Sequence, residues 1–565
     1  MYVLGLWDGH DSGAALLEDG KIIFAANEER YTKRKLEIKF PYNSIRAALE
    51  YAKIKPTDVE IVAFSTTSFT KTLERVLPYT KEYYYTFRRR KMLKPALTDL
   101  RHFLKYEMTS VGVLPLCGTI SKRIIANQLD SMGFSGYRLY AVDHHTAHAA
   151  TAAFTSGFEK SLVITLDGLG DGLSGSISTL EKGKLQRHKA ISAGNSLGIF
   201  YEQVTNIVGM RELEDEGKVM AMADFSFPFG FERNRLKEFF TVDGTDIIAR
   251  YGPVSQYNML SRIAWSIPRE QFAYMAQQVA EKVLSEFTSN AIDQYGIGNV
   301  AFAGGIFSNV KANMKIKDLK KLRNWFVFPH MGDGGLAMGA AMYTNYVENG
   351  ISSYKMEDAY LGNEFGEQQI KNALRKEKNL HFEQVSDPGR HAGELINKNN
   401  YLFWFQGRME YGPRAMGNRS ILANAGDEDV KERLNLHVKQ REWYQPFAPA
   451  VLREDAGRLF EGLKGDGRFM TMVYKVRKEC KDAMKSVIHV DMTARPQILE
   501  NKNAQYENIM KEVRKKAGYG VVLNTSFNIH GMPIVLTPED AIDTMKKTNT
   551  RYMFLGNFFV ENRSR

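Results

Sequence analysis

The chain has 565 residues, of which 44% are hydrophobic and 25% charged, and its formal net charge is +11. This length exceeds what one hydrophobic core supports, so we expect two or three domains, folded throughout. The N-terminal apolar run stops at Asp8 and no later run reaches the length of a membrane span, so we expect neither a signal peptide nor a membrane partner. Only two cysteines occur, Cys117 and Cys480, which argues against a disulfide framework and favours a cytoplasmic protein.

Two segments of the first half follow one plan, in which an apolar strand leads into an Asp-Gly loop and then into a hairpin. Residues 2–8 precede the first loop, and the Asp-Gly pair at 19–20 predicts the hairpin turn. Residues 161–167 precede the second loop, and the Lys-Gly pair at 182–183 predicts its turn. The repetition indicates an internally duplicated α/β domain. Each loop would place a carboxylate and backbone N–H groups where they can hold phosphate oxygens and a cation.

The segment that follows Asp143 has the features of a helix start with metal ligands. Asp143 is the expected N-cap, and His144 and His148 would lie one turn apart on the same face. Two imidazoles at this spacing are a common way to hold a divalent metal, although buried polar residues at a helix start explain the spacing equally well. Asp167 and Asp333, each at the end of a predicted strand, would complete a mixed histidine and carboxylate site.

Glycine and amide side chains near other strand ends are candidates for nucleotide binding. Gly304 and Gly305 would let a base or phosphate approach the backbone, while Asn309 and Asn313 share one helix face and can hydrogen-bond a ribose or base. Lys218 lies beside an acidic run and can contact phosphate, the alternative being a solvated loop.

The second half restarts at about residue 356 and carries a cluster of basic motifs. Three arginines alternate with glycines over residues 408–420, and further downstream come Lys439, Arg495 and Asn524. One loop arginine is usually solvated or paired, but guanidinium groups bind phosphate in a bidentate way and glycines expose backbone donors. The set together predicts an anion-binding site.

A basic segment lies between the two repeats. Residues 71–107 contain ten Lys or Arg against four Asp or Glu, with the basic run 88–91 close to the tyrosines at 83–85. This mixture is compatible with a nucleic-acid patch. The simpler interpretation is the solvated face of an inserted helix.

Five motifs resemble a known family: DHHTAHAA, LDGLGDG, EGKVMAMA, FAGGIFSNVKAN and GDGGLAMGAA. They resemble the N-terminal domain of the O-carbamoyltransferases that act on antibiotics and nodulation factors, such as the nebramycin and cephalosporin enzymes. That domain is similar to the tRNA-threonylcarbamoylation ATPase of the actin and hexokinase superfamily, a duplicated α/β fold. The basic motifs of the second half resemble the C-terminal α/β, threonylcarbamoyl-AMP synthase-like domain of the same enzymes. The resemblance implies domains at residues 1–355 and 356–565.

The resemblance also implies three sets of site residues. A divalent metal, ferrous iron or magnesium, that bridges ATP phosphates would be held by His144, His148, Asp167 and Asp333. ATP would be bound by Asp11, Gly168, Lys218, Gly304, Gly305, Asn309 and Asn313. Carbamoyl phosphate would be bound by Arg414, Lys439, Arg495 and Asn524. The catalytic residues would be His10, Lys439 and Arg414.

These features predict an ATP-dependent O-carbamoyltransferase that moves a carbamoyl group from carbamoyl phosphate, through carbamoyl adenylate, to a hydroxyl of a sugar or natural product. One alternative is threonylcarbamoyl-type transfer to tRNA, which the basic segment would support. Hydrogenase maturation is a second alternative, but two cysteines are too few for the zinc fingers of such proteins. A third is a nucleotide-dependent interaction protein without catalysis, which would have no need of an arginine cluster.

Overall fold

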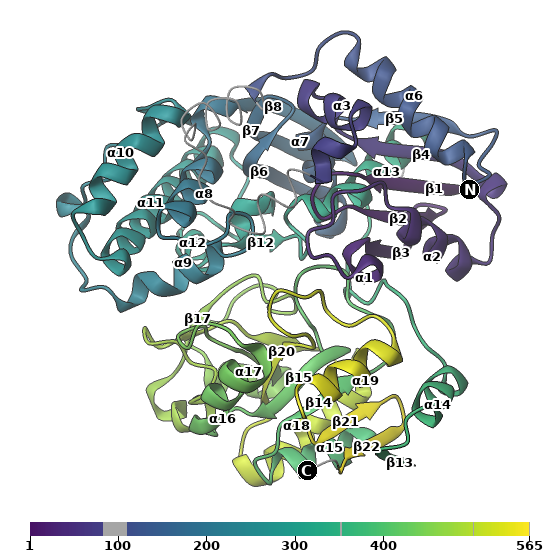
Figure 1. Cartoon of the computed structure of the whole chain (residues 1–565). Coiled ribbons are helices and arrows are strands. Elements are labelled where there is room, and N and C mark those ends of the chain that lie inside the picture. Colours follow the sequence, from purple (N-terminus) through teal and green to yellow (C-terminus); the bar gives the residue numbers. More distant parts are fainter. Residues whose placement is uncertain (83–109, 351–352, 501, 564–565) are drawn as a thin grey trace. The chain divides into compact units, whose positions relative to one another are not determined.

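A computed structural model of the chain describes residues 1–82, 110–350, 353–500 and 502–563 (Figure 1). The chain divides into two compact units, which are called unit 1 (residues 1–28 and 36–356) and unit 2 (residues 29–35 and 357–565). Within the described ranges, every helix is too short or too polar to cross a membrane.

Unit 1 contains two five-stranded sheets that share one strand order. The first sheet runs in the order β3 (Lys21–Asn27), β2 (Gly13–Glu18), β1 (Tyr2–Trp7), β4 (Val59–Ser65) and β5 (Arg138–Val142). The second runs in the order β8 (Lys184–Ser192), β7 (Leu173–Glu181), β6 (Lys160–Gly170), β11 (Asn299–Ala303) and β12 (Asn324–Val327). In both sheets three antiparallel strands are followed by two parallel ones. The predicted duplication is confirmed, and the repeated order gives unit 1 an actin/hexokinase-like fold.

Two helices of small residues lie at the centre of unit 1, α7 (His144–Thr155) and α13 (Leu336–Asn349). They pack on each other, α13 contacts β1 and β4 of the first sheet, and α7 contacts β6 and β11 of the second. A Cβ on Gly339 would lie 2.1 Å from the carbonyl oxygen of Ala147, so the two helices approach too closely for any larger residue. This close contact holds the N-terminus of α7 beside the strand ends of both sheets.

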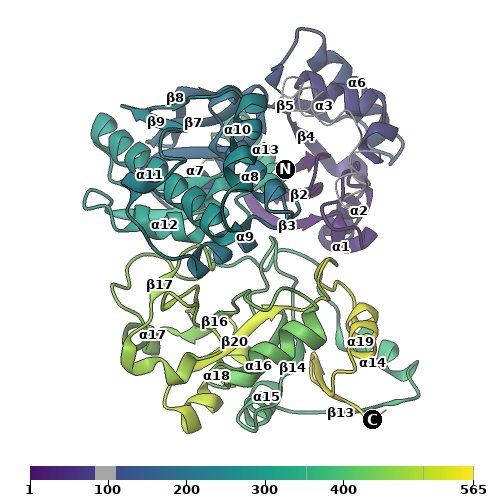
Figure 2. The same ribbon diagram turned by 60° about the vertical axis from the view of Figure 1, so that its left-hand side comes forward.

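Some of the other helices of unit 1 contact a sheet, and the rest pack on those helices. They are α2 (Tyr42–Ala52), α3 (Phe69–Val76), α6 (Cys117–Asp130), α8 (Leu197–Ile207), α9 (Glu216–Met222), α10 (Pro253–Trp265), α11 (Arg269–Tyr295) and α12 (Val310–Lys317). Figure 2 shows the long helix α11 beside α8 and α12, which both contact it. A separate hairpin is formed by β9 (Phe240–Asp243) and β10 (Asp246–Ala249).

Unit 2 is built on one mixed, eight-stranded sheet. Its strands run in the order β13 (Leu380–Gln384), β22 (Phe558–Asn562), β21 (Tyr552–Leu555), β14 (Leu402–Phe405), β15 (Arg419–Asn424), β20 (Val521–Ser526), β16 (Ala448–Leu452) and β19 (Gln497–Leu499). Its helices are α1 (Glu29–Thr32), α14 (Glu367–Arg375), α15 (Pro388–Ile396), α16 (Glu428–Arg433), α17 (Arg453–Leu459), α18 (Ala504–Ala517) and α19 (Pro538–Lys547). The strands β17 (Tyr474–Lys475) and β18 (Thr493–Ala494) form a small hairpin. The core lies where α15 and α18 pack on the sheet around Trp404, Tyr506 and Phe554.

The local signals read from the sequence are confirmed in unit 1. Residues Asp19 and Gly20 have φ angles of 49° and 78°, and Lys182 and Gly183 have 50° and 75°, as type I′ hairpin turns require. Asp143 is the N-cap of α7, since its carboxylate accepts the Thr146 backbone N–H at 2.8 Å.

The basic segment differs from its expected solvated state. Most of it falls at residues 83–109, outside the described residues. In the described part, Lys71, Arg75 and Lys81 are buried and all three pair with the buried carboxylate of Asp8. The solvated-face interpretation is therefore wrong for these three residues. They are buried because each pairs with the carboxylate of Asp8, which directly follows β1.

Candidate metal and anion sites

Four side chains that are far apart in sequence meet at the strand ends of unit 1. His144 and His148 come from the first two turns of α7, which follows β5 directly. Asp167 lies in β6 where the pairing register with β7 breaks after Leu166, and such an irregularity redirects a side chain. Asp333 opens a short 3₁₀ turn, η6 (Asp333–Gly335), a few residues after β12.

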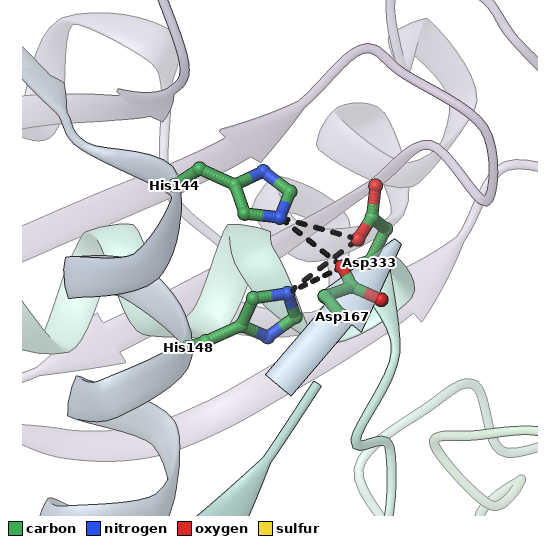
Figure 3. A group of neighbouring side chains, drawn as sticks. All are labelled: His144, His148, Asp167 and Asp333. Carbon is green, nitrogen blue, oxygen red and sulfur yellow. Dashed lines mark hydrogen bonds and ion pairs between the residues drawn. The ribbon is translucent and has the colours of Figure 1, made fainter. Parts of the chain in front are cut away.

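The ligand atoms of these four residues all lie within 4.8 Å of one another (Figure 3). The Nε2 atoms of His144 and His148 are each 3.2 Å from Asp167 Oδ2. The same two nitrogens are 3.6 and 3.5 Å from Asp333 Oδ1. Both histidines are 1% exposed, so solvent contributes little screening inside the cluster.

The electrostatics of the cluster favour a bound cation. Burial and the negative charge of Asp167 raise the pKa of Asp333 well above its usual value. Burial would lower the pKa of His144, but Asp333 and the hydrogen bond to Asp167 raise it. Protons thus partly neutralise the cluster when no metal is bound, and a divalent cation would displace them. Two imidazoles with two carboxylates suit iron, manganese or zinc, and suit magnesium less well.

Asp167 is oriented by the glycines that follow β11. The backbone N–H of Gly305 donates to Asp167 Oδ1 at 3.0 Å, which leaves Oδ2 directed at the histidines. Gly304 has φ of 103°, and a Cβ there would lie 2.0 Å from the carbonyl oxygen of Leu166. Their structural task is therefore to support Asp167. A Cβ on Gly168, by contrast, would meet open space.

His10 lies at the edge of the metal cluster. Its Nε2 is 3.1 Å from Asp333 Oδ2, and its side chain is 31% exposed. The indole N–H of Trp7 donates to the His10 carbonyl at 2.7 Å, which fixes the loop. Asp11 has φ of 59° and its carbonyl accepts Asn27 Nδ2 at 2.8 Å. Its negative charge contributes to the raised pKa of Asp333.

The other predicted nucleotide contacts are engaged within unit 1. Asn309 caps α12, and its amide exchanges hydrogen bonds with that of Gln277 at 2.9 and 3.1 Å. Asn313 donates to the carbonyl of Phe307 at 2.8 Å. Lys218 pairs with Asp215 at 2.9 Å. The two asparagines thus help to build the strand-to-helix turn.

In unit 2, a buried carboxylate shapes the loop that carries Arg414. One oxygen of Glu410 accepts the backbone N–H groups of Met416, Asn418 and Arg419 at 2.8 to 3.0 Å. Glu410 is 1% exposed, so these hydrogen bonds are shielded from water. The loop between β14 and β15 is thereby folded around one acceptor.

Three arginines of unit 2 lie close enough to repel one another. Burial lowers the pKa of Arg414. Burial followed by the charge of Arg414 lowers the pKa of Arg441 to about 9, and burial followed by both neighbours lowers the pKa of Arg495 well below its usual value. Among the described residues, no carboxylate raises the pKa of any of these three arginines. A group of cations without a carboxylate partner in the described ranges has the chemistry to bind a strongly charged anion.

Asn524 and Lys439 border this arginine cluster. Asn524 Nδ2 donates to the carbonyl of Ala415 at 3.0 Å and to Gln497 Oε1 at 3.2 Å. Its Oδ1 is buried and has no hydrogen-bond partner among the described residues. Lys439 is the last residue of a π-helical turn, and its ammonium contacts oxygens of Ser526 and Asn528 at 2.6 to 3.1 Å. The four positions predicted for carbamoyl phosphate therefore belong to connected loops.

Comparison with known proteins assigns the family. A family model described as the carbamoyltransferase N-terminus matches residues 2–242 and 252–342, and one described as the carbamoyltransferase C-terminus matches residues 393–562. The chain belongs to the carbamoyltransferase family. Its assignment as an enzyme, a carbamoyl-group transferase, follows from this membership.

Two named proteins show how far the similarity extends. The nodulation protein NolNO of Sinorhizobium fredii is 30% identical, over 98% of this carbamoyltransferase and 79% of NolNO. The 3'-hydroxymethylcephem-O-carbamoyltransferase of Streptomyces clavuligerus is 28% identical, over 62% of this chain and 65% of that enzyme. A solved structure of full-length HypF, phosphate- and nucleotide-bound, is 13% identical and overlays 62% of this chain and 56% of HypF with a TM-score of 0.32. The fold of unit 1 is therefore assigned from its strand order.

One member of the arginine cluster was missed by the site prediction for this carbamoyltransferase. Arg441 is held by Asn435 Oδ1, which accepts from Nε at 2.7 Å, and by the ring of Phe447, 4.4 Å from its guanidinium carbon. Its position two residues after Lys439 was the available signal. The hydrogen bond of Arg441 to Asn435 and its contact with Phe447 are not apparent from sequence spacing.

Proposed function

We propose that this carbamoyltransferase uses carbamoyl phosphate and ATP to form carbamoyl adenylate, and that the acceptor is a hydroxyl of a small molecule. The observation that carries the proposal is the unpaired arginine cluster beside the orphaned oxygen of Asn524. An anion with a neighbouring N–H donor satisfies both features.

The carbamoyl end of the donor would be recognised by Asn524. The amide orientation of Asn524 is set by its neighbours, because Gln497 donates to the Met416 carbonyl at 2.8 Å and so presents an oxygen to Asn524 Nδ2. Oδ1 is left as a buried acceptor, and leaving it unpaired costs about 1–3 kcal/mol. A carbamoyl NH₂ group would donate to it, whereas an acetyl group would not.

The phosphate of carbamoyl phosphate would be bound by Arg414, Arg441 and Arg495. Lys439 would add a further positive charge to the site. Water attacks phosphorus, the P–O bond to the carbamoyl group breaks, and phosphate and carbamate are formed. A carbamate oxygen then attacks the α-phosphorus of ATP and displaces pyrophosphate, which gives carbamoyl adenylate. The cations stabilise the negative charge that develops in both steps.

Transfer to the acceptor would take place in unit 1. The acceptor hydroxyl attacks the carbamoyl carbon, its proton goes to a base, and AMP leaves. His10 is the proposed base, because it is partly exposed and its Nε2 lies 3.1 Å from Asp333 Oδ2, which can orient the ring. A divalent metal held by His144, His148, Asp167 and Asp333 would offset negative charge on the nucleotide phosphates when it is bound. The proposed ATP contacts of this unit are Asp11, Gly168, Lys218, Gly304, Gly305, Asn309 and Asn313.

A small-molecule acceptor is favoured over tRNA by two observations. The name of the Streptomyces clavuligerus relative specifies a hydroxymethyl group as its acceptor. The described basic residues Lys71, Arg75 and Lys81 are buried and paired, so they offer no surface to a nucleic acid.

Substitution of Asn524 tests the donor assignment. Asn524→Leu keeps the volume and removes the acceptor, so kcat/KM for carbamoyl phosphate in pyrophosphate release should fall about 10- to 100-fold. Inhibition by inorganic phosphate should stay within about threefold of the wild type, because phosphate needs only the arginines. Equal losses for both molecules, or no loss for either, would contradict the assignment of Asn524 to the carbamoyl group.

A further inference from the structure

The guanidinium of Arg75, on α3, has an oxygen acceptor for every N–H that it carries. Nε and Nη2 donate to the two carboxylate oxygens of Asp8 at 3.0 and 2.8 Å. Nη1 donates to the Thr66 carbonyl at 2.7 Å and to Ser121 Oγ at 2.9 Å. Nη2 also donates to the Ser65 carbonyl at 3.2 Å. The side chain is 1% exposed, so no lysine could replace this set of contacts.

The carboxylate at the centre of this network is held by further cations. Lys71 Nζ donates to the Asp8 carbonyl at 2.9 Å, and Lys81 Nζ lies 3.2 Å from Asp8 Oδ2. Burial would raise the pKa of Asp8, but the charges of Arg75, Lys71 and Lys81 hold it well below its usual value. Asp8 therefore stays ionised at neutral pH and the network stays assembled.

The network ties two strand ends together. Asp8 directly follows β1 and Thr66 directly follows β4, and these strands are parallel neighbours with Leu6 opposite Phe64. Both residues consequently leave the sheet at the same edge, where Trp7 and Thr66 contact His144 at the start of α7. Arg75 joins the two exits through the carboxylate of one and the carbonyl of the other.

Thr66 has a backbone conformation that needs such support. Its φ is 72°, in the left-handed region that a β-branched residue rarely adopts, at a cost of about 1–3 kcal/mol. The Thr66 N–H donates to the Val142 carbonyl at 2.9 Å, while its own carbonyl is held by Arg75. Both the backbone N–H and the carbonyl of Thr66 are thus held by hydrogen bonds.

This conformation places the Thr66 hydroxyl beside the metal cluster. Thr66 Oγ1 lies 3.4 Å from His144 Nδ1, and the opposite ring nitrogen, Nε2, faces Asp167 at 3.2 Å. The Trp7 ring packs edge-on against the imidazole with centroids 6.1 Å apart. The imidazole is therefore contacted at its second nitrogen and along its ring.

We propose that Thr66 is a positioning residue for His144, and that the Arg75–Asp8 pair holds Thr66 in the conformation which this contact requires. A hydrogen bond at Nδ1 fixes the rotation of the ring and leaves Nε2 as the ligand atom. The inference rests on the proposed metal site, because its purpose is to orient one of the four ligands.

Cobalt binding tests the role of Thr66 without any substrate. Metal-stripped protein is titrated with Co²⁺ against a chelating dye, and the visible absorption of bound Co²⁺ is recorded. Thr66→Val keeps the shape of the side chain and removes the hydroxyl, so we expect about 10-fold weaker binding and an altered Co²⁺ spectrum. Thr66→Ser keeps the hydroxyl and should bind within about threefold of the wild type. Thr205→Val is the matched control, since Thr205 is a buried residue of unit 1 whose hydroxyl donates to the Tyr201 carbonyl.

The outcomes separate the inference from the proposed function. Wild-type affinity and spectrum in Thr66→Val would overturn the positioning role while the metal site stands. Failure of the wild type itself to bind Co²⁺ would remove the metal site and the inference with it. If Thr66→Val does not fold, Arg75→Lys provides the second test, because it keeps the positive charge and loses the bond to the Thr66 carbonyl. That variant should also weaken Co²⁺ binding, and unchanged binding in it would overturn the proposal.

Discussion

Replacing Arg495 with methionine should abolish the use of carbamoyl phosphate and at the same time make the protein more stable. Arg495 is partly buried near Arg414 and Arg441, and burial followed by the charges of these two arginines lowers its pKa well below its usual value. Removing one of three like charges should raise the free energy of unfolding by about 1–2 kcal/mol. Removing a bidentate phosphate contact should lower kcat/KM for carbamoyl phosphate about 100- to 1,000-fold.

Arg468→Met provides the matched control in the same unit. Arg468 is also largely buried, at 12% exposure, but it pairs with Asp466 at 2.5 Å. Burial lowers the pKa of Arg468, and the hydrogen bond and charge of Asp466 raise it above its usual value. This variant should lose stability and keep activity, the opposite of Arg495→Met. Urea unfolding measures the stability of each variant, and pyrophosphate release measures its activity. If both variants change stability and activity in the same direction, an anion-binding role for the cluster is contradicted.

Asp167→Asn should have the second large effect, on metal binding. Asp167 Oδ2 is the atom closest to both histidine nitrogens, and the Gly305 N–H fixes the other oxygen. The amide keeps the shape and removes the charge, so affinity for Co²⁺ should fall more than about 100-fold, beyond the 10- to 100-fold typical of residues that only support a ligand. Asp455→Asn, which alters a buried carboxylate of unit 2 that accepts the Gly520 N–H, should bind Co²⁺ as the wild type does.

The pH dependence of Co²⁺ binding provides a second test of the Asp167→Asn variant. Because burial and Asp167 raise the pKa of Asp333, binding must displace protons, and wild-type affinity should increase with pH. In Asp167→Asn the repulsion that raises this pKa is gone, so the dependence should be shallower. An unchanged affinity and slope in the variant would contradict a metal site at these residues. Carbamoyl phosphate-dependent pyrophosphate release should persist within about tenfold if adenylation belongs to unit 2 alone.

Much of unit 1 was predictable because its signals are local. The positive-φ turns at residues 19–20 and 182–183 and the N-cap Asp143 follow from adjacent residues, and the repeated hairpins gave the duplication. Two histidines one turn apart and two aspartates after strands sufficed to name the cluster of four, because strand ends of a parallel pair meet at one sheet edge.

The features that were not predicted depend on contacts between distant residues. Burial of Lys71, Arg75 and Lys81 follows from Asp8, more than sixty positions away, and a basic run alone favours solvent. The left-handed Thr66 has no local cause, since its conformation is held by Arg75 and Val142.

Other differences have the same origin. Asn309 is predicted to contact a ribose or base; its amide pairs with Gln277 on α11, and nothing near Asn309 in the sequence indicates that partner. In unit 2, Arg441 lies near Arg414 and Arg495, and its contacts with Asn435 and Phe447 are not visible in the sequence pattern. The strand order of the eight-stranded sheet also cannot be predicted from local sequence patterns, because it depends on which distant strands pair.

The central claim is that this carbamoyltransferase forms carbamoyl adenylate, and nucleotide turnover without an acceptor tests it most directly. Purified protein is incubated with ATP and a divalent metal, with and without carbamoyl phosphate, and pyrophosphate, AMP and ADP are separated and quantified. The account predicts pyrophosphate release that requires carbamoyl phosphate, with negligible ADP. Conversion of ATP to ADP regardless of carbamoyl phosphate, or no cleavage of ATP under either condition, would contradict it.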